Sequence, residues 1–404
     1  MKKRAFIAAL GGAALGLLTA CNSAAALETV KPEAAQKFLG PLFIGTNYTV
    51  KPLAQSDGIM RLFDVETPYG QYQFDGTEFA KMRLQELRAT ATLEKVSQSE
   101  AFVTAFGRTA LAPAKYGVDL ITNPVDTIGR SLGGVANMFD RVGAGLANNH
   151  ADRDNLPDSL LGVSDSQREL AVELGVDPYT DFPPLAEKLK QIAGALAGGG
   201  LPVKAGLAFI PGGVGLAISS ASTVGNAKDV LSNKTAAQLI GEVRTILKSL
   251  DVPGETMDRF VENRNYTPAD LLIAARALAQ LGAQNTAVFV ALAAEAGSRN
   301  AAFYQRVEAE LLAARSAELG GIAGFITVSG HVVTVTRAGN VVAAFPFDGL
   351  AWTAIPQRTF AEVTTGLPSG SGTPVFATTG EVTPMAAAGI GKLGWKIVRV
   401  KPLR

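Results

Sequence analysis

The chain has 404 residues, of which 18% are charged, and its formal net charge at pH 7 is +1. This length allows two or three domains of about 100–200 residues each. No long basic run follows the first few residues, so the sequence lacks the electrostatic signature of a nucleic-acid-binding protein. With two histidines and one cysteine, zinc sites built from several such ligands are excluded, and no cofactor is predicted.

The first twenty residues have the three parts of a secretory signal peptide. Lys2, Lys3 and Arg4 form a positive cluster, and residues 5–18 are apolar apart from glycine and alanine. This run is shorter than the roughly 20 residues of a comfortable membrane span. Leu18-Thr19-Ala20-Cys21 then resembles the lipobox of bacterial lipoproteins, in which a Leu and two small residues precede an obligatory Cys.

The resemblance implies cleavage before Cys21 and a diacylglycerol on its sulfur, often with a third acyl chain on the new amino terminus. Cys21 is the only cysteine, and lipidation would remove a free thiol that is a liability in an oxidising compartment. Two or more acyl chains anchor stably, at about 0.8 kcal/mol per buried CH₂. Asn22, where inner-membrane lipoproteins tend to have Asp, suggests the periplasmic face of the outer membrane. An ordinary signal peptide with an accidental cysteine is the alternative.

After the signal, the sequence predicts a tether and then a small β element. The tether, residues 21–36, is small, polar and rich in alanine. Residues 37–76 contain short β-like segments separated by turn signals, which favours an antiparallel hairpin or meander. The strand candidates are residues 48–53, 59–65 and 69–74.

Residues 77–320 are predicted to form a helical domain with short connections that favour antiparallel packing. Apolar residues recur there at helical spacing. Ser97 with Glu100 and Thr235 with Gln238 have the spacing of capping boxes, and Pro253-Gly254 is expected to turn the chain. The predicted helices are residues 77–96, a helix from 101, and 124–141, 165–175, 183–196, 236–250, 268–280, 285–296 and 300–319.

Residues 192–223 form the most unusual stretch. Lys204 is its only charged residue, and glycines and prolines divide it into pieces shorter than a membrane span. A buried helical hairpin is the favoured interpretation. A hairpin that contacts or enters lipid is the alternative.

Residues 321–404 are predicted to form a strand-rich mixed module, so the expected fold is mainly α with β additions (α+β). The module begins with a meander and ends with a strand–helix–strand unit. Thr383-Pro384 provides the N-cap and first residue of its helix. The expected strands are 325–329, 331–336, 341–345, 374–378 and 395–400, with one or two helical turns at 358–364 and a helix at 384–392.

Motifs that carry chemistry are scarce. No Gly-x-Ser-x-Gly elbow is present, and the Gly389–Leu393 segment lacks the Ser or Thr of a phosphate loop. The best metal candidate is the acidic loop of His150, Asp152, Asp154 and Asp158, but its spacing does not fit a calcium loop and a solvated loop is favoured. Paired catalytic carboxylates are set by space, not by sequence spacing. The acids considered, none of them assigned a catalytic role, are Glu100, Asp126, Asp140 and Asp270.

These observations predict a membrane-anchored envelope lipoprotein that acts as a structural or interaction component rather than an enzyme. Its expected partners are the membrane, through Cys21, and envelope proteins or peptidoglycan, but not nucleic acid. One alternative is a membrane-active or lipid-handling protein that uses residues 192–223. Another is a carboxylate-dependent cell-wall enzyme.

Overall fold

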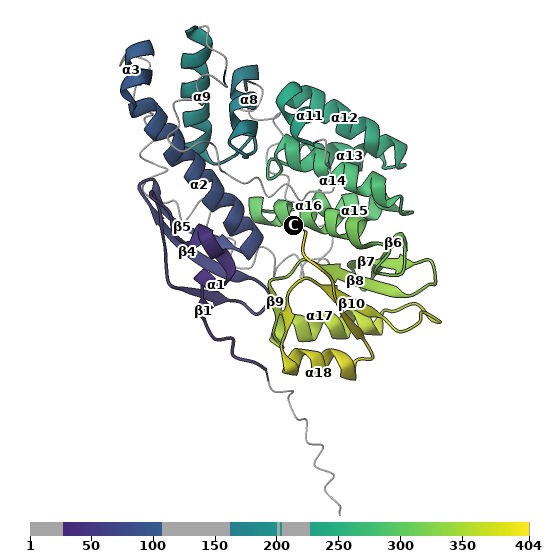
Figure 1. Ribbon diagram of the computed structural model, residues 1–404. Coiled ribbons are helices and arrows are strands. Elements are labelled where there is room, and N and C mark those ends of the chain that lie inside the picture. Colours follow the sequence, from purple (N-terminus) through teal and green to yellow (C-terminus); the bar gives the residue numbers. More distant parts are fainter. Residues whose placement is uncertain (1–26, 107–161, 200–202, 204–226, 404) are drawn as a thin grey trace, which may run out of the picture.

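The computed structural model describes residues 27–106, 162–199, 203 and 227–403. Its fold is α+β, as predicted, with an N-terminal antiparallel sheet, a helical body and a C-terminal mixed sheet (Figure 1). The predicted helix at 124–141, the acidic loop and most of segment 192–223 lie outside the described residues.

The N-terminal sheet is built around β4 (Arg61–Thr67), whose residues alternate between buried and less buried positions. The hairpin partner β5 (Gly70–Asp75) pairs along one edge of β4, while β2 (Thr49–Val50) and β3 (Leu53–Ser56) share the other. All these pairs are antiparallel, which confirms the predicted meander. The short elements β1 (Glu33–Ala34), α1 (Gln36–Leu39) and the 3₁₀ helix η1 (Gly40–Phe43) complete this part of the chain.

The described part of the helical body contains ten helices. The longest is α2 (Thr77–Gln98), which packs against α9 (Pro183–Gly198), and α9 packs in turn against α8 (Asp165–Glu173). A second group of helices follows in the sequence. In it, α14 (Pro268–Leu281) packs on both α12 (Ala236–Ser249) and α16 (Arg299–Arg315) (Figure 1). The remaining bounds are α3 (Glu100–Phe106), α11 (Ala227–Asn233), α13 (Gly254–Val261) and α15 (Thr286–Ala293).

Three local predictions are corrected by the structure. Ser97 lies inside α2, and Ser99 caps α3 instead, because its Oγ accepts a hydrogen bond from the Phe102 amide at 3.2 Å. Gly254 does not form a plain turn but begins α13, because Pro253 supplies an extended entry and Glu255 an acidic first turn. The segment expected to make one or two turns at 358–364 is a helix of 12 residues, α17 (Ala354–Thr365).

The C-terminal sheet has the strand order β12-β10-β8-β7-β6. The meander β6 (Ile322–Val328), β7 (His331–Thr336) and β8 (Val341–Phe345) is antiparallel, whereas β8, β10 (Val375–Thr378) and β12 (Lys396–Arg399) are parallel. Parallel pairing requires crossover connections. They contain α17 and α18 (Pro384–Lys392), as the predicted strand–helix–strand unit required, together with the short parallel pair β9 (Gly349–Leu350) and β11 (Glu381–Val382).

Both faces of the C-terminal sheet are covered. Helices α17 and α18 lie on one side, and α15 and α16 on the other (Figure 1). Val333 and Val341 belong to a hydrophobic core shared with the N-terminal sheet and α2, whereas Val342 and Ala344 belong to the core of α12–α16. Burial on both faces explains the nearly continuous run of β-branched residues in β7. None of the described helices is both long enough and apolar enough to cross a membrane.

Candidate functional site

Among the candidate residues taken from the sequence, the structure brings only Asp270 into a cluster of charged groups. Glu100 begins α3, with no ion pair among the described residues. Within the described ranges, no group of three His, Cys, Asp or Glu residues is placed to hold a metal ion. The other candidates lie outside these ranges: Cys21, Asp126, Asp140, His150, Asp152, Asp154 and Asp158.

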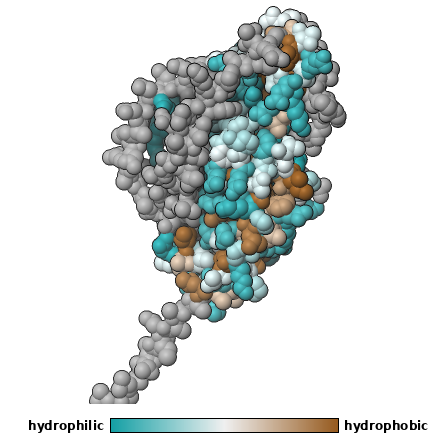
Figure 2. Space-filling view, turned by 90° about the vertical axis from the view of Figure 1, so that its left-hand side faces the viewer, coloured by the Kyte–Doolittle hydropathy of each residue, from teal (hydrophilic) through white to brown (hydrophobic). Residues whose placement is uncertain are grey.

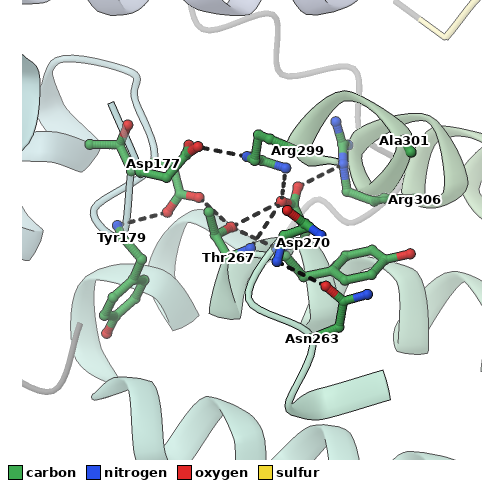
Figure 3. Close-up of polar contacts among 12 residues, drawn as sticks. Asp177, Tyr179, Asn263, Thr267, Asp270, Arg299, Ala301 and Arg306 are labelled. Carbon is green, nitrogen blue, oxygen red and sulfur yellow. Dashed lines mark hydrogen bonds and ion pairs between the residues drawn. The ribbon is translucent and has the colours of Figure 1, made fainter. Parts of the chain in front are cut away.

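Asp270 lies in the first turn of α14 and is the centre of a buried ionic network (Figure 3). Its amide donates to Thr267 Oγ1 at 3.2 Å, and its carboxylate accepts from the Thr267 amide at 3.3 Å, which makes a reciprocal helix cap. The same carboxylate binds Arg299 Nη1 at 2.6 Å and Arg306 Nε at 3.0 Å. One side chain therefore both caps α14 and ties that helix to α16.

The network continues from Arg299 to the segment that precedes α9. Arg299 Nε lies 3.1 Å from Asp181, and Arg83 of α2 donates to both oxygens of Asp181 at 2.9 Å. Arg83 also pairs with Glu86 at 2.7 Å. Although burial alone would raise the pKa of Asp181, the two guanidinium groups hold it well below its usual range. The ion pairs therefore join α2, α14 and α16 through a loop that packs beside all three.

Asp177 lies next to this network and differs from the other acids. Its carboxylate accepts from the Tyr179 amide at 2.8 Å and from Thr267 Oγ1 at 2.6 Å, but no cation of the described chain pairs with it at salt-bridge distance. Burial, followed by the nearby charge of Asp270, raises the pKa of Asp177 to about 7. Near pH 7 the protonated and ionised forms of this carboxyl are therefore both populated.

The raised pKa of Asp177 predicts a pH-dependent stability. A carboxyl whose pKa is higher in the folded than in the unfolded chain binds more protons when folded, so stability falls as pH rises from about 4 to about 7. We expect Asp177→Asn to reduce that fall, because an amide does not ionise and its oxygen can still accept the hydrogen bond from the Tyr179 amide. Urea unfolding at pH 5 and pH 8 measures the effect. If the free energy of unfolding depends on pH in the same way in the wild-type and the variant protein, the raised pKa of Asp177 is contradicted.

The geometry favours a structural role for Asp270. A general acid or base needs an oxygen that is free to meet the substrate. Both Asp270 oxygens are bound by arginine, at 2.6 and 3.0 Å. Among the acids of this network, Asp177 is the one whose pKa is raised to about 7, and nothing in its sequence neighbourhood distinguished it from a turn residue.

A second polar cluster fixes the N-terminal end of the described chain to the C-terminal sheet region. The Glu28 amide donates to the Trp352 carbonyl at 3.0 Å, and the Glu28 carboxylate accepts from the Trp352 amide. The same carboxylate accepts from Thr383 Oγ1 at 2.6 Å, and Thr383 is the N-cap of α18. The chain that follows the predicted lipidation site is therefore held beside the start of α18.

A cavity of about 60 Å³ lies within the C-terminal sheet and is bordered by α16 and α17. Its walls are mostly apolar, with Glu308 and Thr359 among the polar exceptions. No family model, curated protein or solved structure is significantly similar to this chain.

Proposed function

We propose that the protein is a lipid-anchored component of the bacterial cell envelope, held on the outer membrane through Cys21 and acting by binding other envelope components. The observation that carries the proposal is the signal sequence that ends at Cys21, the only cysteine of the chain. Its use as a lipid attachment site accounts both for its position and for its being alone.

The contacts of Glu28 indicate which surface of the protein would face the membrane. Glu28 lies seven positions after Cys21, since 28 − 21 = 7, and these seven steps span at most about 25 Å when the chain is fully extended. The surface around Glu28 and the start of α18 would therefore lie close to the lipid headgroups.

Exposed apolar side chains support this orientation. Leu27 precedes Glu28, and Met385 lies in the first turn of α18, whose N-cap binds the Glu28 carboxylate. The other large hydrophobic side chains exposed in the described part are Ile44 and Leu53, both near the N-terminal sheet. On the face shown in Figure 2, hydrophobic residues are scattered from the upper to the lower end.

The lipid anchor is tested by metabolic labelling with palmitate. We expect wild-type protein to be labelled and found in the outer-membrane fraction. Cys21→Ala should abolish the label completely and leave a precursor longer by the 20 residues Met1–Ala20, because processing depends on the lipidated cysteine. Ser23→Ala, two residues away, is the matched control and should be labelled normally. An unlabelled wild-type protein, or a Cys21→Ala protein that is still cleaved, would overturn the proposal.

The interaction role is tested separately, by crosslinking in intact envelopes followed by pull-down from detergent. We expect a discrete protein or peptidoglycan fragment whose recovery falls with Cys21→Ala. Recovery of lipid alone would instead favour the lipid-handling alternative, which uses residues 192–223.

A carboxylate-dependent cell-wall hydrolase is the second candidate. One observation favours it: the pKa of Asp177 beside Asp270 is raised to about 7, and enzymes tune general acids toward the operating pH. Because both Asp177 oxygens accept hydrogen bonds within the protein, a substrate would have to displace one of these donors. Clearing of a peptidoglycan zymogram by wild-type protein, lost in Asp177→Asn, would support the hydrolase. An inactive wild-type protein would remove it.

A further inference from the structure

The C-terminal sheet opens between its two central antiparallel strands. The ladder between β7 and β8 contains only the pairs Thr334↔Val342 and Val335↔Val341. On their outer edges, β7 remains paired with β6 as far as His331, and β8 remains paired with β10 as far as Phe345. The strands therefore diverge while each keeps its other neighbour, so the inner strand edges beyond Thr334 and Val342 have no strand partner.

The cavity occupies this opening. It is lined by residues 331–334 of β7 and by residues 342–345 of β8. These segments begin at the last ladder pair, Thr334↔Val342, and their remaining residues would pair if the ladder continued. Helix α16 closes one side with residues 305, 308 and 312, which share a helical face, and α17 closes the other with residues 359, 360 and 363. A volume of about 60 Å³ is several times the roughly 10–15 Å³ that one water needs.

Two buried polar groups in the cavity wall lack partners. Glu308 is 7% exposed and Thr359 is 3% exposed. Neither Glu308 Oε2 nor Thr359 Oγ1 has a hydrogen-bond partner among the described residues. Buried polar groups are nearly always hydrogen-bonded, because an unpaired one forfeits its hydration without compensation. Two such atoms in the wall of one apolar cavity indicate that their partner is a molecule inside it.

The charge state of Glu308 selects the class of that molecule. Burial raises the pKa of Glu308 well above its usual value, and no charged neighbour offsets the effect. Burial therefore favours the neutral carboxyl, whose O–H can donate a hydrogen bond. Binding a cation would require both partners to be charged in an apolar enclosure, and each ion would lose its hydration. A neutral ligand that accepts a hydrogen bond avoids that loss.

We propose that the opening between β7 and β8 binds a small, uncharged, largely apolar molecule through a carbonyl oxygen that accepts a hydrogen bond from Glu308, with Thr359 as a second polar group in the cavity wall. The apolar body of the ligand packs among the aromatic and β-branched residues of the sheet and α17, including Phe360 and Trp395. His331, at the end of β7, lies in the cavity wall and 3.4 Å from the half-exposed Glu362, which places this side of the cavity nearest to solvent. The proposed site is independent of the lipid anchor.

The test compares acetone with isobutane, an alkane of similar size, as probes for the mature chain of residues 22–404, which lacks the signal peptide and Cys21 and is purified without detergent. Affinity is measured by ligand-observed NMR. We expect saturable binding of the ketone with about tenfold preference over the alkane. Glu308→Leu should abolish that preference and leave denaturant resistance unchanged or higher, because it replaces an unpaired buried carboxyl by an apolar side chain of similar size. Glu362→Gln removes the neighbouring half-exposed carboxylate and should leave the preference intact.

Equal binding of ketone and alkane would overturn the proposal in favour of a non-specific apolar void. Absence of saturable binding to wild-type protein would overturn it in favour of a cavity filled by water. A preference that persists in Glu308→Leu would show that the carboxyl does not recognise the ligand, and would equally reject the assignment.

Discussion

Asp270→Asn is expected to lower the free energy of unfolding by about 3–5 kcal/mol, the cost of removing one partner from a buried ion pair. Asp270 is 5% exposed and binds two arginines. The amide keeps the shape of the side chain but leaves Arg299 and Arg306 without the charge that offsets their burial. Urea unfolding monitored by tryptophan fluorescence measures the change.

Asp258→Asn is the matched control for this prediction. Asp258 also pairs with an arginine, Arg244, but the two side chains are 50% and 39% exposed. Exposed pairs contribute about 0.2–1 kcal/mol, so the control should stay within that range. If Asp270→Asn costs no more than Asp258→Asn, the network does not stabilise the packing of α14 on α16. Coupling to Arg299 is then examined with Asp270→Asn combined with Arg299→Met, which should be less destabilised than the sum of the single variants.

Gly76→Ala is expected to destabilise the protein by about 2–5 kcal/mol through two separate effects. Gly76 joins β5 to α2 with φ of +92° and ψ of 141°, a conformation that side chains rarely adopt. A Cβ at this position would also lie 1.9 Å from Tyr304 Oη, inside the packed interface with α16. Backbone strain and overpacking therefore act together. The measurement is again the free energy of unfolding in urea.

Gly339→Ala separates the two effects. Gly339 has φ of +82° in the β7–β8 hairpin, and a Cβ there would meet no atom within 4 Å. This variant should show the conformational cost alone, about 1–2 kcal/mol. Equal losses in the two alanine variants would mean that Tyr304 moves aside freely, and that the contact between α2 and α16 is not tightly packed.

The local elements could be predicted because their signals lie within a few residues of the chain. Thr235 and Gln238 form the predicted capping box, and Thr383 accepts from the Ala386 amide at 3.1 Å as expected of an N-cap. The alternation of residues 325–345 and the turn at 337–340 were enough to place a meander. The prediction that Ser97 is an N-cap was wrong. Two serines, Ser97 and Ser99, lie close to the start of the same helix, and the backbone conformation makes Ser99 the cap.

The candidate site was less predictable, because its residues meet only after folding. Asp348, which lies outside that site, illustrates such a contact. It accepts hydrogen bonds from the Thr77 amide at 2.9 and 3.1 Å and so caps α2 from 271 positions away. Asp270 was considered from the sequence as helix support, and its role in that helix start is confirmed. Its arginine partners were not visible, since sequence spacing carries no information on contacts between distant segments.

The sequence by itself determined the α+β class and the starts of several helices, because periodicity and capping patterns are read along the chain. Tertiary structure alone decided which charges are buried together and where the sheet opens. Burial shifts the pKa of Asp177 and Glu308 because packing removes water from them, and their sequence neighbours do not fix that packing. The opening between β7 and β8 is likewise lined by side chains of α16 and α17, which the strand sequences themselves do not specify.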